Sequence, residues 1–346
     1  MNPTALSMFI SALGLGTIIT LSSYHWLLAW AGLEINTLAI IPLMASMHHP
    51  RAIEATTKYF LTQAAAAALI LFASINSAWL SGEWATTTPM DPISITLITV
   101  ALTIKLGLAP FHFWLPDVLQ GLTLNTGLIL STWQKLAPIG LLFTISPNLN
   151  TPLILTLATL STLVGGWGGL NQTQIRKIMA YSSIAHLGWM TVILTTLPKL
   201  TILALAIYLV STTLMFLTFN LMLTTKISTL ATSWIKNPFL AMLTPLSLLS
   251  LGGLPPLSGF MPKWLILTEL TKQGIITIAL VMTLSSLLNL FFYLRLSYSL
   301  ALTISPNFSN SSPTWRVKTN SNPMISTTLI LSFLLLPLSP SLMNIL

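Results

Sequence analysis

The chain alternates between long apolar stretches and short polar connections, which is typical of a polypeptide that crosses a membrane many times. A helix needs roughly 20 apolar residues to cross a hydrocarbon layer about 30 Å thick. On this basis the pattern predicts an all-α polytopic membrane protein with about eleven transmembrane helices. The predicted spans are 3–22, 25–47, 57–80, 92–111, 124–145, 151–170, 177–196, 200–223, 238–257, 274–297 and 324–344.

Two of these spans, the fourth and the ninth, contain helix-breaking residues. The pattern Gly-x-x-Pro-x-x-x-x-x-Pro-charged begins at Gly107 and again at Gly253, an offset of 146 residues. The other matching pairs are Pro110 and Pro256, Pro116 and Pro262, and Asp117 and Lys263. A broken helix frees backbone groups, which are tolerated at membrane depth only inside protein or beside a water-filled cavity. The two breaks therefore indicate an ion pathway.

The offset between the breaks also predicts the domain organisation. Residues 1–146 form a first five-helix repeat and residues 147–298 a second one. A polar loop at 299–323 and a C-terminal transmembrane helix at 324–346 complete a single antiporter-like membrane domain. Because five is odd, the second repeat is expected to be inverted relative to the first, as in many secondary transporters.

Composition narrows the chemistry. Of 346 residues, 54% are hydrophobic and only 6% charged, with a mean hydropathy of +0.84. The formal charge of +8 is spread over connections and contains no long basic run, so it favours membrane topology over nucleic-acid binding. With no cysteine, the chain cannot form disulfides or thiolate-held iron–sulfur clusters. No two of its five histidines have the spacing of metal ligands on one helix face.

The basic residues of the connections predict the orientation. Nine lie in or near even-numbered connections, against Lys199 and Lys272 in odd-numbered ones. The nine are Arg51, Lys58, Arg176, Lys177, Lys226, Lys236, Arg295, Arg316 and Lys318. By the positive-inside rule the N-terminus is expected on the matrix or cytoplasmic side and the C-terminus on the opposite side.

Four charged residues remain within or beside predicted spans: Glu34, Lys105, Lys135 and Lys263. Each would cost about 2.5–3.5 kcal/mol near the bilayer centre. A purely structural reading, in which lysines reach an interface or Glu34 and Lys105 form an inert pair, fits single residues better than the set. Burial disfavours the charged form of lysine and a nearby carboxylate favours it, so a lysine between these effects can take up and release a proton.

The broken helices should also distinguish the lysines. Lys105 ends a half-helix, where the helix dipole favours a cation, whereas Lys263 begins one, where the dipole disfavours it. The two lysines are therefore expected to differ in proton affinity. His112 and His186 are candidate proton relays, since neutral imidazole can pass a proton near neutral pH, but either could equally be a hydrogen-bonded core residue.

The motif Ala180-Tyr-Ser-Ser-Ile-Ala-His-Leu-Gly188, the two Gly-x-x-Pro breaks and the four buried charges resemble the antiporter-like subunits of respiratory complex I. The resemblance covers the whole chain and implies proton pumping, with proton-transfer roles for Glu34, Lys105, Lys135 and Lys263. The chain has fewer predicted spans than bacterial members, the missing ones being N-terminal. Contacts made by those helices are not carried over.

The resemblance further implies a place in the mitochondrial inner membrane, with other membrane-arm subunits of the complex and membrane lipids as partners. It implies no cofactor or metal on this chain. FMN, iron–sulfur clusters, NADH and ubiquinone are expected on other subunits, which would drive proton translocation here as part of NADH:ubiquinone oxidoreductase.

Two other functions remain open from the sequence. A free-standing cation/proton antiporter would need its own oxygen ligands, and Glu34 is the only carboxylate within a predicted span, which disfavours it. A structural scaffold of the membrane arm would not explain four intramembrane charges. Neutralising these charges separates the scaffold from the pump.

Overall fold

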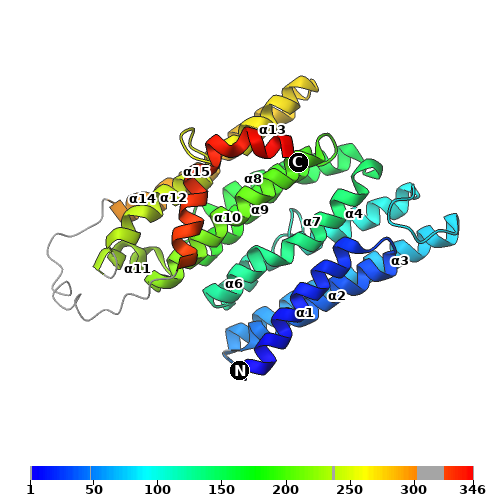
Figure 1. Cartoon of the computed structure of the whole chain (residues 1–346), viewed down its shortest axis with the longest axis horizontal. Coiled ribbons are helices and arrows are strands. Elements are labelled where there is room, and N and C mark those ends of the chain that lie inside the picture. Colours follow the sequence, from blue (N-terminus) through cyan, green and yellow to red (C-terminus); the bar gives the residue numbers. More distant parts are fainter. Residues whose placement is uncertain (1, 47, 236–237, 302–322, 346) are drawn as a thin grey trace. The chain divides into compact units, whose positions relative to one another are not determined.

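The computed structural model describes residues 2–46, 48–235, 238–301 and 323–345. These residues are almost entirely helical (Figure 1). The expected all-α fold is thus confirmed, whereas most of the predicted polar loop at 299–323 lies outside the described residues. The contacts divide the chain into two compact units, Met1–Ser161 with Leu194–Pro198, and Thr162–Ile193 with Lys199–Leu346.

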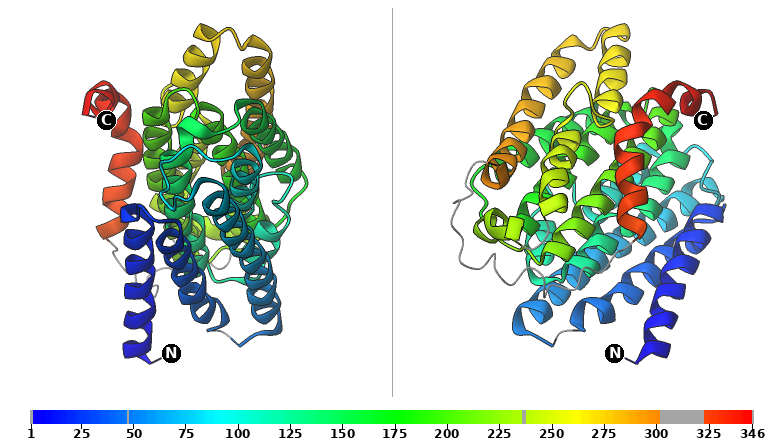
Figure 2. Two further views of the ribbon diagram at one scale, coloured as in Figure 1. Left: turned by 90° about the vertical axis from the view of Figure 1, so that its right-hand side faces the viewer. Right: turned by 60° about the vertical axis from the view of Figure 1, so that its left-hand side comes forward.

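The first unit is built around three helices that pack in sequence order, α1, α2 and α3 (Figures 1 and 2). Close approach of α1 and α2 requires Gly16 and Gly32, since a Cβ on either would lie 2.9 Å from the other's carbonyl oxygen. The unit's helices are α1 (Pro3–Ser22), α2 (Trp26–Ala45), α3 (Pro50–Ser81), α4 (Pro92–Leu106), α5 (Trp114–Gly121), α6 (Leu124–Ser131), α7 (Trp133–Ile145) and the start of α8 (Thr151–Gly169).

The second unit contains the end of α8 and the helices after it. The glycine run at the end of α8 lets α9 and α14 pack closely: a Cβ on Gly165 would lie 2.8 Å from the Ala185 nitrogen, and one on Gly166 would lie 2.9 Å from the Leu288 Cβ. The remaining helices are α9 (Ile175–Ile193), α10 (Pro198–Met222), α11 (Ile227–Ala231), α12 (Pro238–Gly252), α13 (Phe260–Lys272), α14 (Ile276–Ala301) and α15 (Pro323–Ile345).

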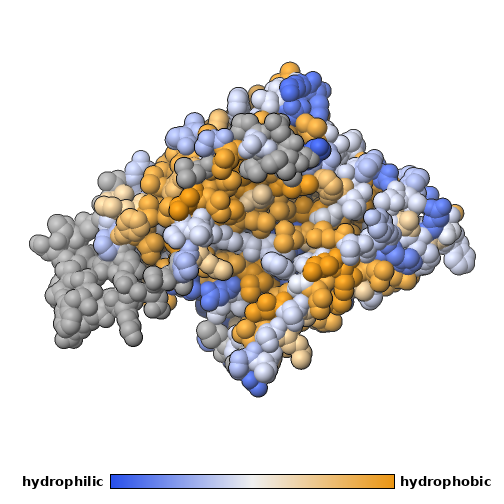
Figure 3. All heavy atoms as spheres, viewed as in Figure 1, coloured by the Kyte–Doolittle hydropathy of each residue, from blue (hydrophilic) through white to orange (hydrophobic). Residues whose placement is uncertain are grey.

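Helix length and surface both indicate a membrane environment. Seven helical segments among the described residues are long and apolar enough to cross a membrane. They are Pro3–Ser22, Trp26–Ala45, Pro50–Ser81, Leu124–Asn148, Thr151–Gly169, Pro198–Met222 and Ile276–Ala301. Large apolar side chains such as Ile18, Phe72 and Leu287 are more than half exposed, and hydrophobic residues cover much of the face in Figure 3. Lipid rather than water suits such a surface.

Both predicted helix breaks are present and have the same backbone geometry. Gly107 follows α4 with φ 77°, and Gly253 follows α12 with φ 83°, a conformation that only glycine adopts without strain. The next amide bonds back across the helix end in each case, from Leu108 to the Thr103 carbonyl and from Leu254 to the Leu249 carbonyl. This glycine-dependent cap satisfies carbonyl groups that hydrocarbon could not.

Two helix boundaries differ from the prediction. α3 begins at Pro50 rather than near residue 57, because a charged first stretch containing Arg51, Glu54 and Lys58 still continues the helix. The predicted span 124–145 is interrupted at Thr132, whose backbone amide and hydroxyl both donate to the Leu128 carbonyl. The Thr212 hydroxyl makes the same kind of bond within α10, which stays continuous, so the hydroxyl bond accompanies this break and does not by itself explain it.

Candidate functional site

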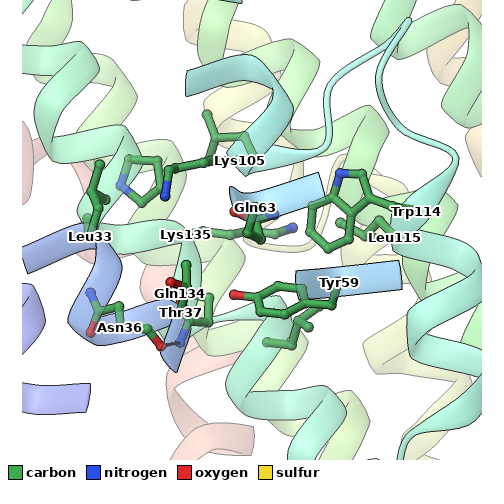
Figure 4. A pocket seen from close by; sticks show the side chains of 14 residues that line it. Leu33, Asn36, Thr37, Tyr59, Gln63, Lys105, Trp114, Leu115, Gln134 and Lys135 are labelled. Carbon is green, nitrogen blue, oxygen red and sulfur yellow. Dashed lines mark hydrogen bonds between the residues drawn. The ribbon is translucent and has the colours of Figure 1, made fainter. Parts of the chain in front are cut away.

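A buried cavity in the first unit brings Lys105 and Lys135 together (Figure 4). Its volume is about 20 Å³. The other polar side chains that line it are Asn36, Thr37, Tyr59, Gln63 and Gln134. They come from α2, α3 and α7, and Lys105 reaches the cavity from the broken end of α4. A cavity needs about 10–15 Å³ to hold one water, so this one can accommodate a water between polar groups.

Lys105 occupies the last turn of α4, as predicted, and is 6% exposed. Its Nζ has no hydrogen-bond partner among the described residues. The indole Nε1 of Trp114 donates a hydrogen bond to the neighbouring Ile104 carbonyl at 3.0 Å. This carbonyl therefore already has a donor other than the lysine. Lys105 is therefore a buried cation held at a helix end but not tied to a carboxylate, which leaves its Nζ available to the cavity.

Glu34 interacts electrostatically with both Lys105 and Tyr59 but is not in ion-pair contact with Lys105. Its Oε2 is buried and, within the described part of the chain, accepts no hydrogen bond. An inert contact pair, one of the structural readings of the sequence, is therefore not what the structure contains. A carboxylate acting across space can bias a lysine's charge without fixing it in place.

Lys135 lies in the first turn of α7, directly after the break at Thr132, and is 4% exposed. Its backbone amide donates to the Thr132 carbonyl at 3.3 Å. The start of a helix carries positive partial charge, which disfavours a cation there. The missed break therefore places Lys135, and not only Lys263, at a helix start.

Sequence reasoning did not identify the uncharged lining residues Tyr59 and Gln63. They are four residues apart on α3 and so share one face of that helix. Gln63 is 3% exposed, and the five residues that follow it, Ala64 to Ala68, are all alanine. Gln63 is therefore an isolated polar side chain at the start of an apolar stretch. That isolation is the signal that could have found it, since polar side chains within a membrane helix usually face the protein interior.

A second cavity, also of about 20 Å³, lies within the second unit and is lined by Lys263 and His186. Lys263 is 8% exposed, and its Nζ donates to the Gly252 carbonyl at 2.7 Å, at the C-terminal end of α12. The prediction from helix position considered only the start of α13 and is incomplete. The side chain reaches back to the C-terminal end of α12, where the helix dipole favours a cation. This favourable interaction offsets the unfavourable dipole at the start of α13.

His186 projects from α9 beside Tyr208 of α10, with ring centroids 5.6 Å apart. Tyr208 hydrogen-bonds with Ser183 and, like Ser211, lines the same cavity. The structure thus brings together two of the residues singled out from sequence, His186 and Lys263, with hydroxyl groups between helices. Hydroxyl and imidazole groups can both give and accept hydrogen bonds, which suits a proton relay.

His112 and Asp117 line neither cavity. His112 is buried at the helix break, hydrogen-bonds with the Pro110 backbone and packs on Phe113 with ring centroids 4.2 Å apart. Asp117, which matches Lys263 in the repeat, is about half exposed and pairs with Lys58 at 3.1 Å. Within the described residues, no group of three or more acidic or histidine side chains has the arrangement of a metal site.

Broken helices with buried lysines that line small cavities between helices are typical of antiporter-like membrane subunits. Residues 23–289 match the family described as NADH:quinone oxidoreductase/Mrp antiporter, and residues 290–343 match the C-terminal region of NADH dehydrogenase subunit 2. A chain of the solved respiratory complex I from Thermus thermophilus is 27% identical, with a TM-score of 0.85 over 99% of this chain and 81% of that one. A chain of the Dietzia Mrp complex, 16% identical with a TM-score of 0.77, shares the fold over 97% of this chain and 75% of that one.

The relatives of this chain include NADH-ubiquinone oxidoreductase chain 2 proteins from several animals. The protein from Carassius auratus is 59% identical and covers 100% of this chain and 99% of its own. Those from Oncorhynchus mykiss and Xenopus laevis are each 61% identical, the first over 99% of this chain and 98% of its own, the second over 98% and 99%. The chain belongs to the NADH-ubiquinone oxidoreductase chain 2 family, and the resemblance drawn from its sequence is confirmed.

Proposed function

We propose that this chain moves protons across the mitochondrial inner membrane along its buried charged residues, Glu34, Lys105, Lys135 and Lys263. As a member of the chain 2 family it is an antiporter-like, proton-translocating membrane subunit of NADH:ubiquinone oxidoreductase. Three of these four groups are lysines, so the main steps transfer a proton between a lysine ammonium and a neutral amine or water.

The observation that carries this proposal is the shared cavity of Lys105 and Lys135. Both Nζ groups belong to nearly buried side chains, and the space between the lining residues can hold a water. Two ammonium groups that line one low-dielectric cavity repel each other, so protonation of one favours release from the other. Glu34 offsets this repulsion at Lys105 and thus sets which lysine holds the proton.

In the second unit we assign the exchange with one side of the membrane to Lys263, with His186 as a relay beside it. The support is their common cavity and the hydroxyl groups of Tyr208 and Ser211 on its wall. Lys135 is proposed to pass the proton from the first unit toward the second. His112, which lies apart from both cavities, is retained only as a candidate relay at the first helix break.

The two-repeat architecture is part of the same proposal: eleven crossings, as two inverted five-helix repeats and a C-terminal helix. In its support, the bounds of α12 (Pro238–Gly252) equal those of α4 (Pro92–Leu106) displaced by 146 residues. Each unit also has one antiparallel bridge between two connections, His25 with Ala85 in the first and Gln174 with Lys226 in the second. Inverted repeats of this kind are typical of secondary transporters.

The proposed orientation has the N-terminus on the matrix side and the C-terminus on the intermembrane side, which rests on the positive-inside rule. The partners are the other membrane-arm subunits of the complex and membrane lipids, without nucleic acid. The driving energy comes from electron transfer from NADH to ubiquinone through FMN and iron–sulfur clusters on other subunits. This chain contributes proton-binding side chains and no redox centre.

Replacement of Lys105 by methionine tests the proposal, because methionine keeps most of the bulk and removes the protonatable amine. The assembled complex with Lys105→Met should reduce ubiquinone and pump protons far more slowly than the wild type. A matched control is Lys58→Met, which removes a lysine whose side chain is 43% exposed in a surface ion pair. Normal pumping with Lys105→Met would refute the lysine pathway.

A further inference from the structure

We propose that Gln63 is a positioning residue for proton transfer, which holds a water molecule between Lys105 and Lys135 without taking the proton itself. The inference rests on the proposed function and deepens it by naming the side chain that orders the path inside the first-unit cavity. Nothing in the charge pattern points to Gln63, because the residue is uncharged.

The burial of Gln63 needs an explanation. The residue is 3% exposed, and its Nε2 donates to no atom in the part of the chain that the structure describes. An amide left without a partner in such a place is unfavourable, and an apolar side chain of the same length would avoid the loss. A ligand in the cavity that accepts a hydrogen bond from this amide would remove this free-energy cost.

The position of Gln63 points to where that ligand lies. The side chain lines the cavity together with Lys105 and Lys135, and Tyr59 lies one turn earlier on the same face of α3. In Figure 4 Gln63 is drawn between the labelled lysines and above the Tyr59 ring. The cavity of about 20 Å³ exceeds the roughly 10–15 Å³ that one water requires, and it has the polar partners that a buried water needs.

An amide suits this role better than a carboxylate. Its carbonyl oxygen accepts and its nitrogen donates, so it can orient a water whether the neighbouring lysine is an ammonium or a neutral amine. It does not titrate, so it cannot trap the proton as a carboxylate could. The proton moves from one lysine Nζ to the water and from the water to the other Nζ, with no net change at Gln63.

The test compares Gln63→Met with Asn76→Leu in the assembled complex reconstituted into lipid vesicles. Methionine keeps the side-chain length and removes both hydrogen-bonding groups. Asn76 is another amide on α3, but it donates to the Ser94 hydroxyl at 3.1 Å and does not line the cavity. Gln63→Met should slow NADH-driven proton pumping by about tenfold, the upper end of the loss expected for one ordinary hydrogen bond, and raise the solvent deuterium isotope effect.

Several outcomes separate the explanations. Asn76→Leu should pump with a normal isotope effect; an equal loss in both variants would overturn the proposal, since the effect would then be structural. Normal pumping with Gln63→Met, while Lys105→Met is impaired, would refute the role of Gln63 alone. If the complex with Gln63→Met does not assemble, the isotope effect is measured for Gln63→Ala, which only removes atoms. An isotope effect equal to that of the wild type would refute the role of Gln63.

Discussion

The ammonium of Lys263 donates a hydrogen bond to the carbonyl oxygen of Gly252, 2.7 Å away. The lysine belongs to the first turns of α13, whereas the carbonyl ends α12, so one side chain joins the two halves of a broken helix. The same contact holds the amine at the wall of the second-unit cavity. A lysine so placed can donate this bond in its charged or neutral form, which allows it to lose a proton without losing its position.

Replacement of Lys263 by arginine or by methionine should impair proton-coupled ubiquinone reduction while the complex still assembles. Arginine keeps the positive charge but does not release a proton near neutral pH, and methionine removes the proton-binding group. The measurements are ubiquinone reduction by the isolated complex and proton uptake in vesicles. If Lys263→Arg pumps normally, Lys263 is a fixed charge and the exchange site lies elsewhere.

Gly253, the glycine after α12, should not tolerate replacement because its backbone is left-handed, whereas the backbone of its neighbour Gly252 is not. Gly253→Ala places a side chain at φ 83°, where the Cβ would also lie 2.9 Å from the Lys263 Nζ. The backbone conformation alone costs about 1–2 kcal/mol. The prediction is a less thermostable complex with slower pumping.

Gly252→Ala is the matched control for that variant. A Cβ at Gly252 would meet only the Tyr293 ring at 3.6 Å and its Cβ at 4.0 Å, which are ordinary contacts. Thermal inactivation of this variant should resemble the wild type, and its carbonyl still accepts from Lys263. Equal losses in the two variants would show that packing at the helix end, rather than the left-handed conformation, is decisive.

The sequence predicted the parts of the fold that depend on single residues and missed those that depend on neighbours. Both helix breaks were predictable because glycine and proline determine local backbone geometry. The break at Thr132 was not, because no glycine or proline stands at that place in the sequence. The hydrogen bond from Lys263 to the Gly252 carbonyl likewise depends on how the loop after the break folds back onto the end of α12. Glu34, Lys105, Lys135 and Lys263 stand out by charge. Gln63 stands out only as an isolated polar residue in an apolar stretch, and its neighbours in the cavity depend on tertiary packing.

Glu34→Gln should slow turnover of the whole complex without preventing its assembly. The substitution keeps the shape of the side chain and removes its negative charge, and a carboxylate's charge biases the proton occupancy of a lysine near it. Glu83→Gln, at an exposed position in the connection after α3, is the control and should behave as the wild type. Unchanged pumping with Glu34→Gln would mean that this carboxylate does not tune the lysine.

The predicted orientation can be read by chemical labelling. A membrane-impermeant amine reagent applied from the intermembrane side should modify Lys199 and Lys272 and miss Lys177 and Lys226. Lys272 is a suitable positive control, since its side chain is 68% exposed at the end of α13. Labelling of Lys177 and Lys226 from that side would reverse the topology.

The central claim is that Lys105 and Lys135 act on one proton path through a shared cavity, and a double-mutant cycle tests it most directly. The proton-pumping rate is measured for Lys105→Met, for Lys135→Met and for the double variant, because residues that act as one unit have non-additive effects. The account predicts that the double variant pumps no more slowly than the slower single variant. If the fold-loss of the double variant equals the product of the two single fold-losses, the account is contradicted, because the two lysines would then act independently.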